Sequence, residues 1–315
     1  MARVQVEMND LNKQRAWLRA ALGRVGVWSI AFDFQPVARE WEALAELERV
    51  GYPALWFAES WRSKEALSHA ALLLARSERI VVVTGIANIW ARDPAAMAAA
   101  GRTLNDAFPR RFVLGIGVSH RTTVDQRGVH QYRRPYARMR EYLDAMEGAA
   151  YAMDPAPDLP PVILATLGPK MLELAAERAA GAHSYFVPVE HTKQAREILG
   201  GDPFLAPEQA VVLETDPSKA RDIARGHMSR YLTLENYIRN LLRLGFSEED
   251  VTQSSDRLVD AIVAWGSADT VAARIKEHHD AGADHVAVQV LSGDPSQLPI
   301  AQLEELAAQF SGTSR

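Results

Sequence analysis

The sequence predicts an α/β protein whose parallel strands close into a (β/α)8 barrel, the TIM-barrel fold, with a helical insertion before the last strand–helix unit. Residues 80–120 indicate this most clearly: a buried strand, a helix opened by Asp93 and Pro94, and a second buried strand at Phe112–Gly117. A single helix between two strands is a crossover connection, which makes the strands parallel. Short apolar runs then alternate with helical patterns from residue 25 to the end, and eight strands are expected.

The first half of the chain contains four of the expected strands. They lie at Val25–Ala31, Ala54–Ala58, Ile80–Ile86 and Phe112–Gly117. Helical patterns follow them at Pro36–Val50, at Glu65–Arg76, in the segment opened by Asp93-Pro94, and at Pro135–Tyr151. In the last of these, Met139, Leu143 and Met146 recur at helical spacing.

The second half is less regular. Strands are expected at Val162–Thr166, Ser184–Val187, Ala210–Leu213 and His285–Leu291. Helices are expected at Pro169–Ala180, Glu190–Leu199, Pro217 to about Tyr231, Ala268–Ala281 and Gln302–Phe310. Residues 232–265 contain two or three helical pieces and no expected strand, which makes them the insertion.

The chain divides on this reading into an N-terminal helical extension at 1–24 and a single barrel domain at 25–315. A doubly wound sheet with an appended helical domain is the competing architecture. The number of strands and the final strand–helix pair favour the barrel.

Composition excludes several classes of function. The 315 residues are 48% hydrophobic and 24% charged, typical of a globular protein with a sizeable core. A net charge of −5 argues against a nucleic-acid partner. No apolar run approaches the roughly 20 residues of a membrane span, and the N-terminus lacks the apolar region of a secretion signal. Cysteine is absent, which excludes disulfides and thiolate chemistry. We expect a cytoplasmic protein.

Polar residues at the strand ends are the candidates for catalysis, because α/β folds build their sites there. His120 follows the fourth strand and titrates nearest neutral pH, so it is an acid/base candidate as well as a possible structural histidine. Glu59 follows the second strand. It either orients a ligand or pairs with Arg92. Trp28, at the end of the first strand, either contacts a planar ligand or only caps the barrel.

Two segments are candidates for anion binding. Gly168, Pro169 and Lys170 open a helix directly after a strand, and free N–H groups there attract anions. The basic run from Arg127 to Arg140 either binds phosphate or is a solvated face. No metal site is expected, because the adjacent His278 and His279 point to different faces of a helix.

Several motifs together resemble the bacterial luciferase-like family of flavin- and deazaflavin-dependent oxidoreductases. They are VGVW (25–28), ALWFAES (54–60), TGIANIWARDP (84–94), RFVLGIGVSH (111–120), RPYARMREYLDAM (134–146), ILATLGPKMLELAAERAAGAH (163–183) and WGSADTVAARIKEHHDAGADHVAVQVL (265–291). More narrowly, the chain resembles an actinobacterial branch that uses coenzyme F420. FMN is the alternative cofactor.

The resemblance implies a homodimer of barrels, with the cofactor ring over the strand ends and a small-molecule substrate beside it. Family members have a non-prolyl cis peptide after the third strand, here expected at Ala87-Asn88 or its neighbour. The cofactor-binding residues that the resemblance implies are Trp28, Ala87, Asn88, Val118, Ser119, Leu167, Gly168, Pro169, Lys170 and Met171. Of these, Leu167 to Met171 form the turn that holds the phosphate side chain of the cofactor.

One position departs from the family. The deazaflavin-dependent sugar-phosphate dehydrogenases of this family have a histidine after an acidic residue at the end of the second strand, whereas this chain has Glu59-Ser60. The expected function is therefore F420-dependent hydride transfer to or from another organic substrate. His120 would exchange the proton, and Glu59 and Ser60 would position ring or substrate. The alternatives are an FMN-dependent monooxygenase and a barrel that binds cofactor without turnover.

Overall fold

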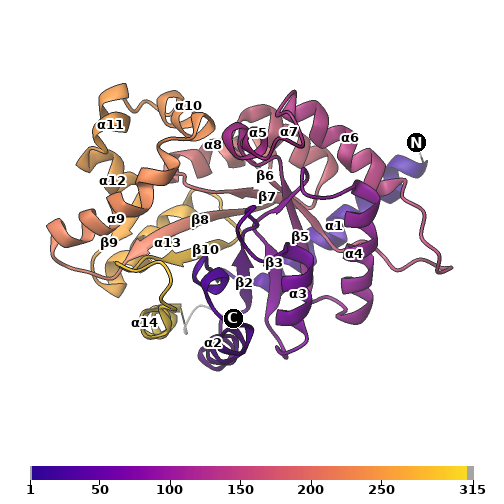
Figure 1. Cartoon of the computed structure of the whole chain (residues 1–315), viewed down its shortest axis with the longest axis horizontal. Helices are drawn as coiled ribbons and strands as arrows, with labels where there is room; N and C mark the ends of the chain where they lie inside the picture. The colour runs from indigo at the N-terminus through magenta and orange to yellow at the C-terminus, as the bar shows by residue number, and fades with distance from the viewer. Residues whose placement is uncertain (1, 311–315) are drawn as a thin grey trace.

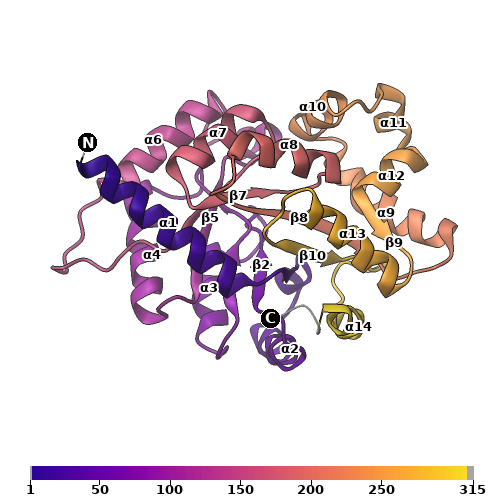
Figure 2. The same cartoon turned by 180° about the vertical axis from the view of Figure 1, so that it is seen from behind.

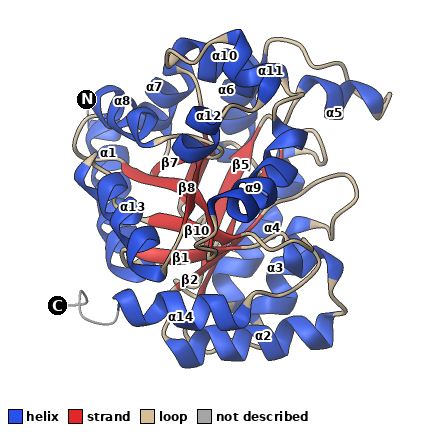
Figure 3. Cartoon of the chain, turned by 90° about the vertical axis from the view of Figure 1, so that its left-hand side faces the viewer, coloured by secondary structure: helices blue, strands red, loops and turns tan. Residues whose placement is uncertain are grey.

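The computed structural model describes residues 2–310, with side chains from residue 10 onward. Its centre is a closed barrel of eight parallel strands (Figures 1 and 3). These are β1 (Val25–Trp28), β2 (Ala54–Phe57), β3 (Val81–Thr84), β5 (Phe112–Gly117), β6 (Val162–Ala165), β7 (Gly181–Ser184), β8 (Phe204–Val212) and β10 (Val286–Val290). They are neighbours in this order, and β10 closes the circle by pairing with both β8 and β1. The predicted barrel is confirmed.

Helices surround the barrel (Figure 3). The outer helices are α2 (Val37–Val50), α3 (Ala66–Leu74), α4 (Pro94–Ala107), α6 (Pro135–Glu147), α7 (Pro169–Arg178), α8 (Val189–Leu199), α9 (Pro217–Tyr231), α13 (Ala268–Asp280) and α14 (Ile300–Phe310). Two short elements follow strands: the 3-10 helix η1 (Ala31–Phe34) after β1 and α5 (Arg121–Gln126) after β5. The helical insertion is present as α10 (Glu235–Arg243), α11 (Glu248–Gln253) and α12 (Asp256–Ile262), grouped at one end of the molecule (Figure 1).

Three strand predictions were wrong. The strand expected at Ser184–Val187 lies at Gly181–Ser184. Phe186 has a φ of 58°, so the extended backbone does not continue through the apolar residues on which the prediction was based. The strand expected at Ala210–Leu213 is the longer β8, in which Pro207 and Glu208 interrupt the apolar pattern. A short strand within 232–265 was not expected, yet β9 (Val263–Trp265) pairs with the end of β8.

The N-terminal helix α1 (Ala2–Leu22) covers the amino-terminal end of the barrel (Figure 2). Leu18 and Leu22 are fully buried in the cluster that fills the barrel interior. Arg15 donates to the carbonyl oxygens of Ala176 (2.9 Å) and Ala179 (3.1 Å), which fixes the helix against the end of α7. Helix α1 does not cover the opposite, carboxyl-terminal end of the barrel, where the candidate functional site lies.

A layer of aromatic rings crosses the interior of the barrel. The indole of Trp56 stacks between His183 and His285, at centroid distances of 4.8 and 5.5 Å. Its Nε1 donates to His285 Nε2 (3.1 Å). The Nδ1 atoms of His183 and His285 donate to the carbonyl oxygens of Ala206 and Gly23. Burial lowers the pKa of both histidines to about 4, so both are neutral at physiological pH.

Candidate active site

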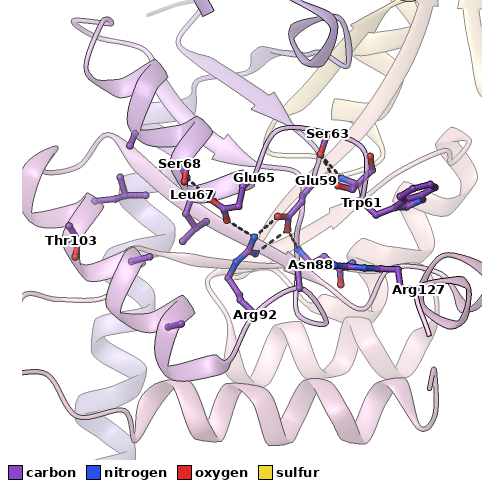
Figure 4. A pocket seen from close by; sticks show the side chains of 16 residues that line it. Glu59, Trp61, Ser63, Glu65, Leu67, Ser68, Asn88, Arg92, Thr103 and Arg127 are labelled. Atoms are coloured by element: carbon purple, nitrogen blue, oxygen red, sulfur yellow. Dashed lines mark hydrogen bonds and ion pairs between the residues drawn. The ribbon is translucent and has the colours of Figure 1, made fainter. Parts of the chain in front are cut away.

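Glu59 lies at the end of β2 and binds its surroundings through both carboxylate oxygens. It forms two hydrogen bonds with the guanidinium of Arg92 and accepts the backbone N–H of Asn88 at 2.7 Å (Figure 4). The side chain is 6% exposed. Of the two interpretations of Glu59, pairing with Arg92 is the one that the structure shows. The pair ties the loop after β2 to the loop after β4 (Ala87–Asn88).

Ser60 belongs to a tight turn. Its N–H donates to Ser63 Oγ (2.7 Å), and its own Oγ accepts the N–H of Arg62 (3.2 Å). Glu59, Ser60 and Asn88 line an open groove of about 730 Å³ between α3 and α4 (Figure 4). Neither His120 nor the turn at Leu167–Met171 lines this groove. Of the three predicted catalytic residues, Glu59 and Ser60 thus line this groove and His120 does not.

The cis peptide bond lies between Gly85 and Ile86, so its expected position at Ala87-Asn88 or its neighbour was wrong. The space beside this bond is narrow, since a Cβ at Gly85 would lie 3.0 Å from Trp28 Nε1. Ala87 and Asn88 instead pair with Ile116 and Gly117 of β5 and are buried. They contribute backbone and packing to the end of the barrel.

Asn88 is also joined to Val118, through Trp90. Its Oδ1 accepts the N–H of Trp90 (2.9 Å), and Trp90 Nε1 donates to the carbonyl oxygen of Val118 (2.9 Å). Ser119 follows with a positive φ of 55°, which turns the chain sharply after β5 and brings His120 to the start of α5. The structure therefore brings Asn88, Val118, Ser119 and His120 to one edge of the barrel end.

His120 is held by the insertion. Its Nδ1 lies 2.9 Å from Asn236 Oδ1, and its ring packs against Tyr237 at 5.2 Å; both partners belong to α10. An amide oxygen only accepts hydrogen bonds, so the imidazole proton sits on Nδ1 and Nε2 carries a free lone pair. Burial lowers the pKa of His120, the hydrogen bond with Asn236 opposes this, and the charge of Arg230 lowers it further, so that the pKa lies below its ordinary value. His120 is therefore a neutral imidazole at pH 7, able to accept a proton at Nε2.

The turn from Leu167 to Met171 also meets α10. The carbonyl oxygen of Leu167 accepts hydrogen bonds from Arg243 Nη2 (2.7 Å) and His191 Nε2 (2.9 Å). Arg243 Nη1 lies 3.6 Å from the point where a Cβ of Gly168 would stand. Pro169 begins α7, whose first turn leaves N–H groups without helical partners, and Lys170 is exposed. A helix N-terminus and a guanidinium thus meet here, which suits an anion.

Aromatic residues fill the middle of the barrel end. The Tyr185 ring lies 4.9 Å from that of Trp28, and its hydroxyl is 2.9 Å from Gln289 Oε1 and 2.8 Å from the Tyr231 hydroxyl. The Tyr185 hydroxyl proton thus has two acceptors in reach, the amide oxygen of Gln289 and the hydroxyl oxygen of Tyr231. Tyr237 packs on Tyr231 and on Phe186. Trp28 is buried, and its Nε1 has no partner among the described residues.

Glu208 is a residue that sequence reasoning missed. It is 2% exposed on β8; its Oε2 accepts the N–H of Phe186 (3.2 Å), while Oε1 has no partner within the described part of the chain. Burial raises the pKa of Glu208 to about 8, so the carboxyl is protonated at neutral pH. The available signal was a lone acidic residue inside the run FLAPEQAVV, which was hidden because the strand was expected to begin at Ala210.

Comparison with known proteins gives the family. The profile described as "Luciferase-like monooxygenase" matches residues 5–285. The chain belongs to this family. It is an enzyme of the luciferase-like oxidoreductase group, as the sequence motifs indicated.

Two relatives agree with that assignment. A 5,10-methylenetetrahydromethanopterin reductase of Archaeoglobus fulgidus is 26% identical over 296 residues, covering 79% of this chain and 87% of the reductase. A putative coenzyme F420-dependent oxidoreductase of Mycobacterium tuberculosis is 28% identical over 188 residues, covering 50% of this chain and 53% of that protein.

Solved structures of luciferase-like proteins share the fold. An F420-dependent secondary alcohol dehydrogenase in complex with an F420-acetone adduct superposes with a TM-score of 0.73 at 14% identity, covering 93% of this chain and 99% of that one. A type II Baeyer-Villiger monooxygenase of Pseudomonas putida in complex with FMN superposes with a TM-score of 0.68 at 18% identity, covering 92% and 96%. At these identities the likeness shows the fold alone.

The described residues form neither a metal-binding cluster nor a membrane-spanning helix. Among residues 10–310, no group of three His, Asp or Glu side chains is placed to hold a metal ion. None of the described helices is both long enough and apolar enough to cross a membrane.

Proposed function

We propose that the chain is an F420-dependent oxidoreductase that transfers hydride between the deazaflavin ring and an organic substrate at the carboxyl end of the barrel. The His120–Asn236 pair carries this proposal, because it holds a neutral imidazole with a free Nε2 at a strand end where luciferase-like enzymes are expected to react. The names of the two relatives above support F420 as the cofactor.

The residues present fit the cofactor. Its anionic tail would lie at Leu167–Met171, where Arg243 and the first turn of α7 supply positive charge. Its ring would lie over the end formed by Trp28, Ala87, Asn88, Val118 and Ser119. When bound, F420 supplies hydride exchange at ring carbon C5.

The side chains of the protein handle the proton and the orientation. In alcohol oxidation, neutral His120 accepts the hydroxyl proton at Nε2; in the reverse direction the imidazolium returns it. Asn236 holds the ring and its tautomer. Glu59 is a positioning residue in this proposal, because its oxygens already bind Arg92 and the Asn88 N–H. Ser60 shapes the same loop through its turn.

Fluorescence titration of the purified protein with F420 tests the proposal. We expect saturable binding at micromolar concentration, and its absence would refute the F420 assignment. Arg243→Met should weaken F420 binding by about tenfold or more, because a charge-assisted hydrogen bond contributes roughly 1.5–3 kcal/mol. The same variant should leave binding of the deazaflavin chromophore without its phosphate tail unchanged. His120→Ala should keep F420 binding and lose turnover; full activity would remove its role.

FMN is the second candidate cofactor, favoured by the FMN-bound structure that shares the fold. A competing titration with FMN separates the two. Tighter FMN binding together with substrate-dependent oxygen uptake would replace the first proposal with a monooxygenase. Tight binding of either cofactor with no transfer to a broad panel of acceptors would indicate a barrel that binds without turnover. The homodimer implied by the family is tested by light scattering during size-exclusion chromatography.

A further inference from the structure

A second cavity, of about 520 Å³, lies between the ends of β1 and β10 and helix α9. Cavities of this size commonly bind small molecules. Trp28 is the one residue it shares with the predicted cofactor-binding set. The lining of this cavity is therefore largely distinct from that set. Most of its wall is apolar, with Ile30, Phe34, Ile223, Leu291, Pro295 and Leu303 among the lining residues.

Polar groups gather on the α9 side of this cavity. Arg230 lines it, and no carboxylate within residues 10–310 lies within ion-pair distance of the Arg230 guanidinium. His227, one turn earlier, also lines it, and His227 Nε2 is a buried atom without a hydrogen-bond partner in the described structure. Asp222 is the acidic residue of the lining, and Arg225 lies 3.9 Å from it. The cavity thus offers an unpaired cation and a free ring nitrogen to a ligand.

The cavity is connected with the proposed reaction site in two ways. Tyr231 and Gln289 line it, and both hydrogen-bond the Tyr185 hydroxyl at the middle of the barrel end. The charge of Arg230 is also one of the causes that lower the pKa of His120. A molecule in the cavity would accordingly lie against Trp28, within electrostatic reach of the candidate base.

We propose that this cavity binds the second reactant, and that this reactant has an apolar, ring-containing body and one anionic group. Arg230 would bind the anion, His227 would add a hydrogen bond, and the apolar wall would hold the rings against Trp28. That the bound molecule is a reactant rests on the proposed function. The binding preference itself follows from the cavity and is testable without any cofactor.

Two fluorescent probes with the same ring system test the preference on the cofactor-free chain. They are 8-anilinonaphthalene-1-sulfonate, which is anionic, and N-phenyl-1-naphthylamine, which is neutral. Arg230→Met should weaken binding of the anionic probe about tenfold and leave the neutral probe unchanged. Lys219→Met removes an equal charge from an exposed position of the same helix and should change neither. Equal binding of the anionic probe to wild type and Arg230→Met would overturn the anion preference.

A second variant tests the place of binding. Gly226 lines the cavity, and a Cβ added there would meet no atom within 4 Å, so a side chain can enter the cavity from the helix. Gly226→Phe should abolish binding of both probes, while Gly226→Ala should retain it. Unchanged probe binding by a folded Gly226→Phe variant would refute the site. F420 titration of the same variant should match wild type, so failure of the cavity proposal and failure of the F420 proposal give different results.

Discussion

His120 Nδ1 and Asn236 Oδ1 lie 2.9 Å apart, which joins the end of β5 to the first turn of α10 across 116 residues of sequence. The bond decides which imidazole nitrogen carries the proton, and Tyr237 packs against the ring at a centroid distance of 5.2 Å. The insertion is thus part of the candidate site and sets the chemistry of its base.

Replacing Asn236 should move the titration of His120. Asn236→Asp places a carboxylate beside Nδ1, which stabilises the imidazolium, so we expect the pKa of His120 to rise from below its usual 6.5 to above it. The imidazole Cε1–H signal in proton NMR, assigned with a His120→Asn variant, measures this. Gln253→Glu adds the same charge on exposed α11 and is the control. An unmoved His120 titration in Asn236→Asp would mean that the two side chains do not interact.

The sequence was sufficient for the barrel and for the position of His120 at the end of β5, because both depend on local pattern. Six apolar or small residues at Phe112–Gly117 define a buried strand, and the polar residues after it must then lie at the barrel end. Asn236, Tyr237 and Arg243 could not be found in this way. Their role depends on how α10 folds over the barrel, and nothing in the local spacing of an amphipathic helix specifies its contacts.

Glu59 shows the other limit of sequence reasoning. Its place at a strand end was predictable, but orienting a ligand and pairing with Arg92 differ only in what the carboxylate contacts. Because Arg92 is 33 residues away, the local sequence around Glu59 does not show that contact. Glu208 was missed because the start of β8 was misplaced. Pro207 and Glu208 are both poor strand formers, and burial in the barrel overrides that local preference.

Removing the charge of Glu59 should destabilise the fold. The side chains of Glu59 and Arg92 are 6% and 13% exposed, so Glu59→Gln leaves Arg92 with Glu65 alone. Breaking a buried pair costs about 3–5 kcal/mol, and we expect about 2–4 kcal/mol here in the free energy of unfolding. Urea denaturation measures it. Lys276→Met breaks an exposed pair and should cost under about 0.5 kcal/mol. If Glu59→Gln were equally mild, a ligand-binding role for Glu59 would gain support.

Two glycine-to-alanine substitutions should have opposite effects. A Cβ at Gly115 would lie 1.9 Å from the carbonyl oxygen of Thr84, because β3 and β5 approach closely there. Gly115→Ala should therefore cost more than about 3 kcal/mol or prevent folding. Gly226 lies inside α9 with open space around it, so Gly226→Ala should stabilise by about 0.5–1 kcal/mol. Thermal melts followed by circular dichroism compare the two; a melting temperature for Gly115→Ala equal to wild type would contradict the close approach.

The buried carboxyl of Glu208 should make stability depend on pH in a particular direction. The pKa of Glu208 is raised to about 8 in the folded state, whereas an unfolded glutamate titrates near 4.5. Between these values the unfolded chain has released the proton that the folded chain retains, so the contribution of Glu208 to stability decreases as pH rises. Glu208→Gln has nearly the same shape and cannot titrate. Its free energy of unfolding should therefore increase relative to wild type from pH 5 to pH 8, by at most about 1.4 kcal/mol per pH unit. Urea denaturation at four pH values measures the difference, and a constant difference would show that Glu208 is ionised in the folded protein.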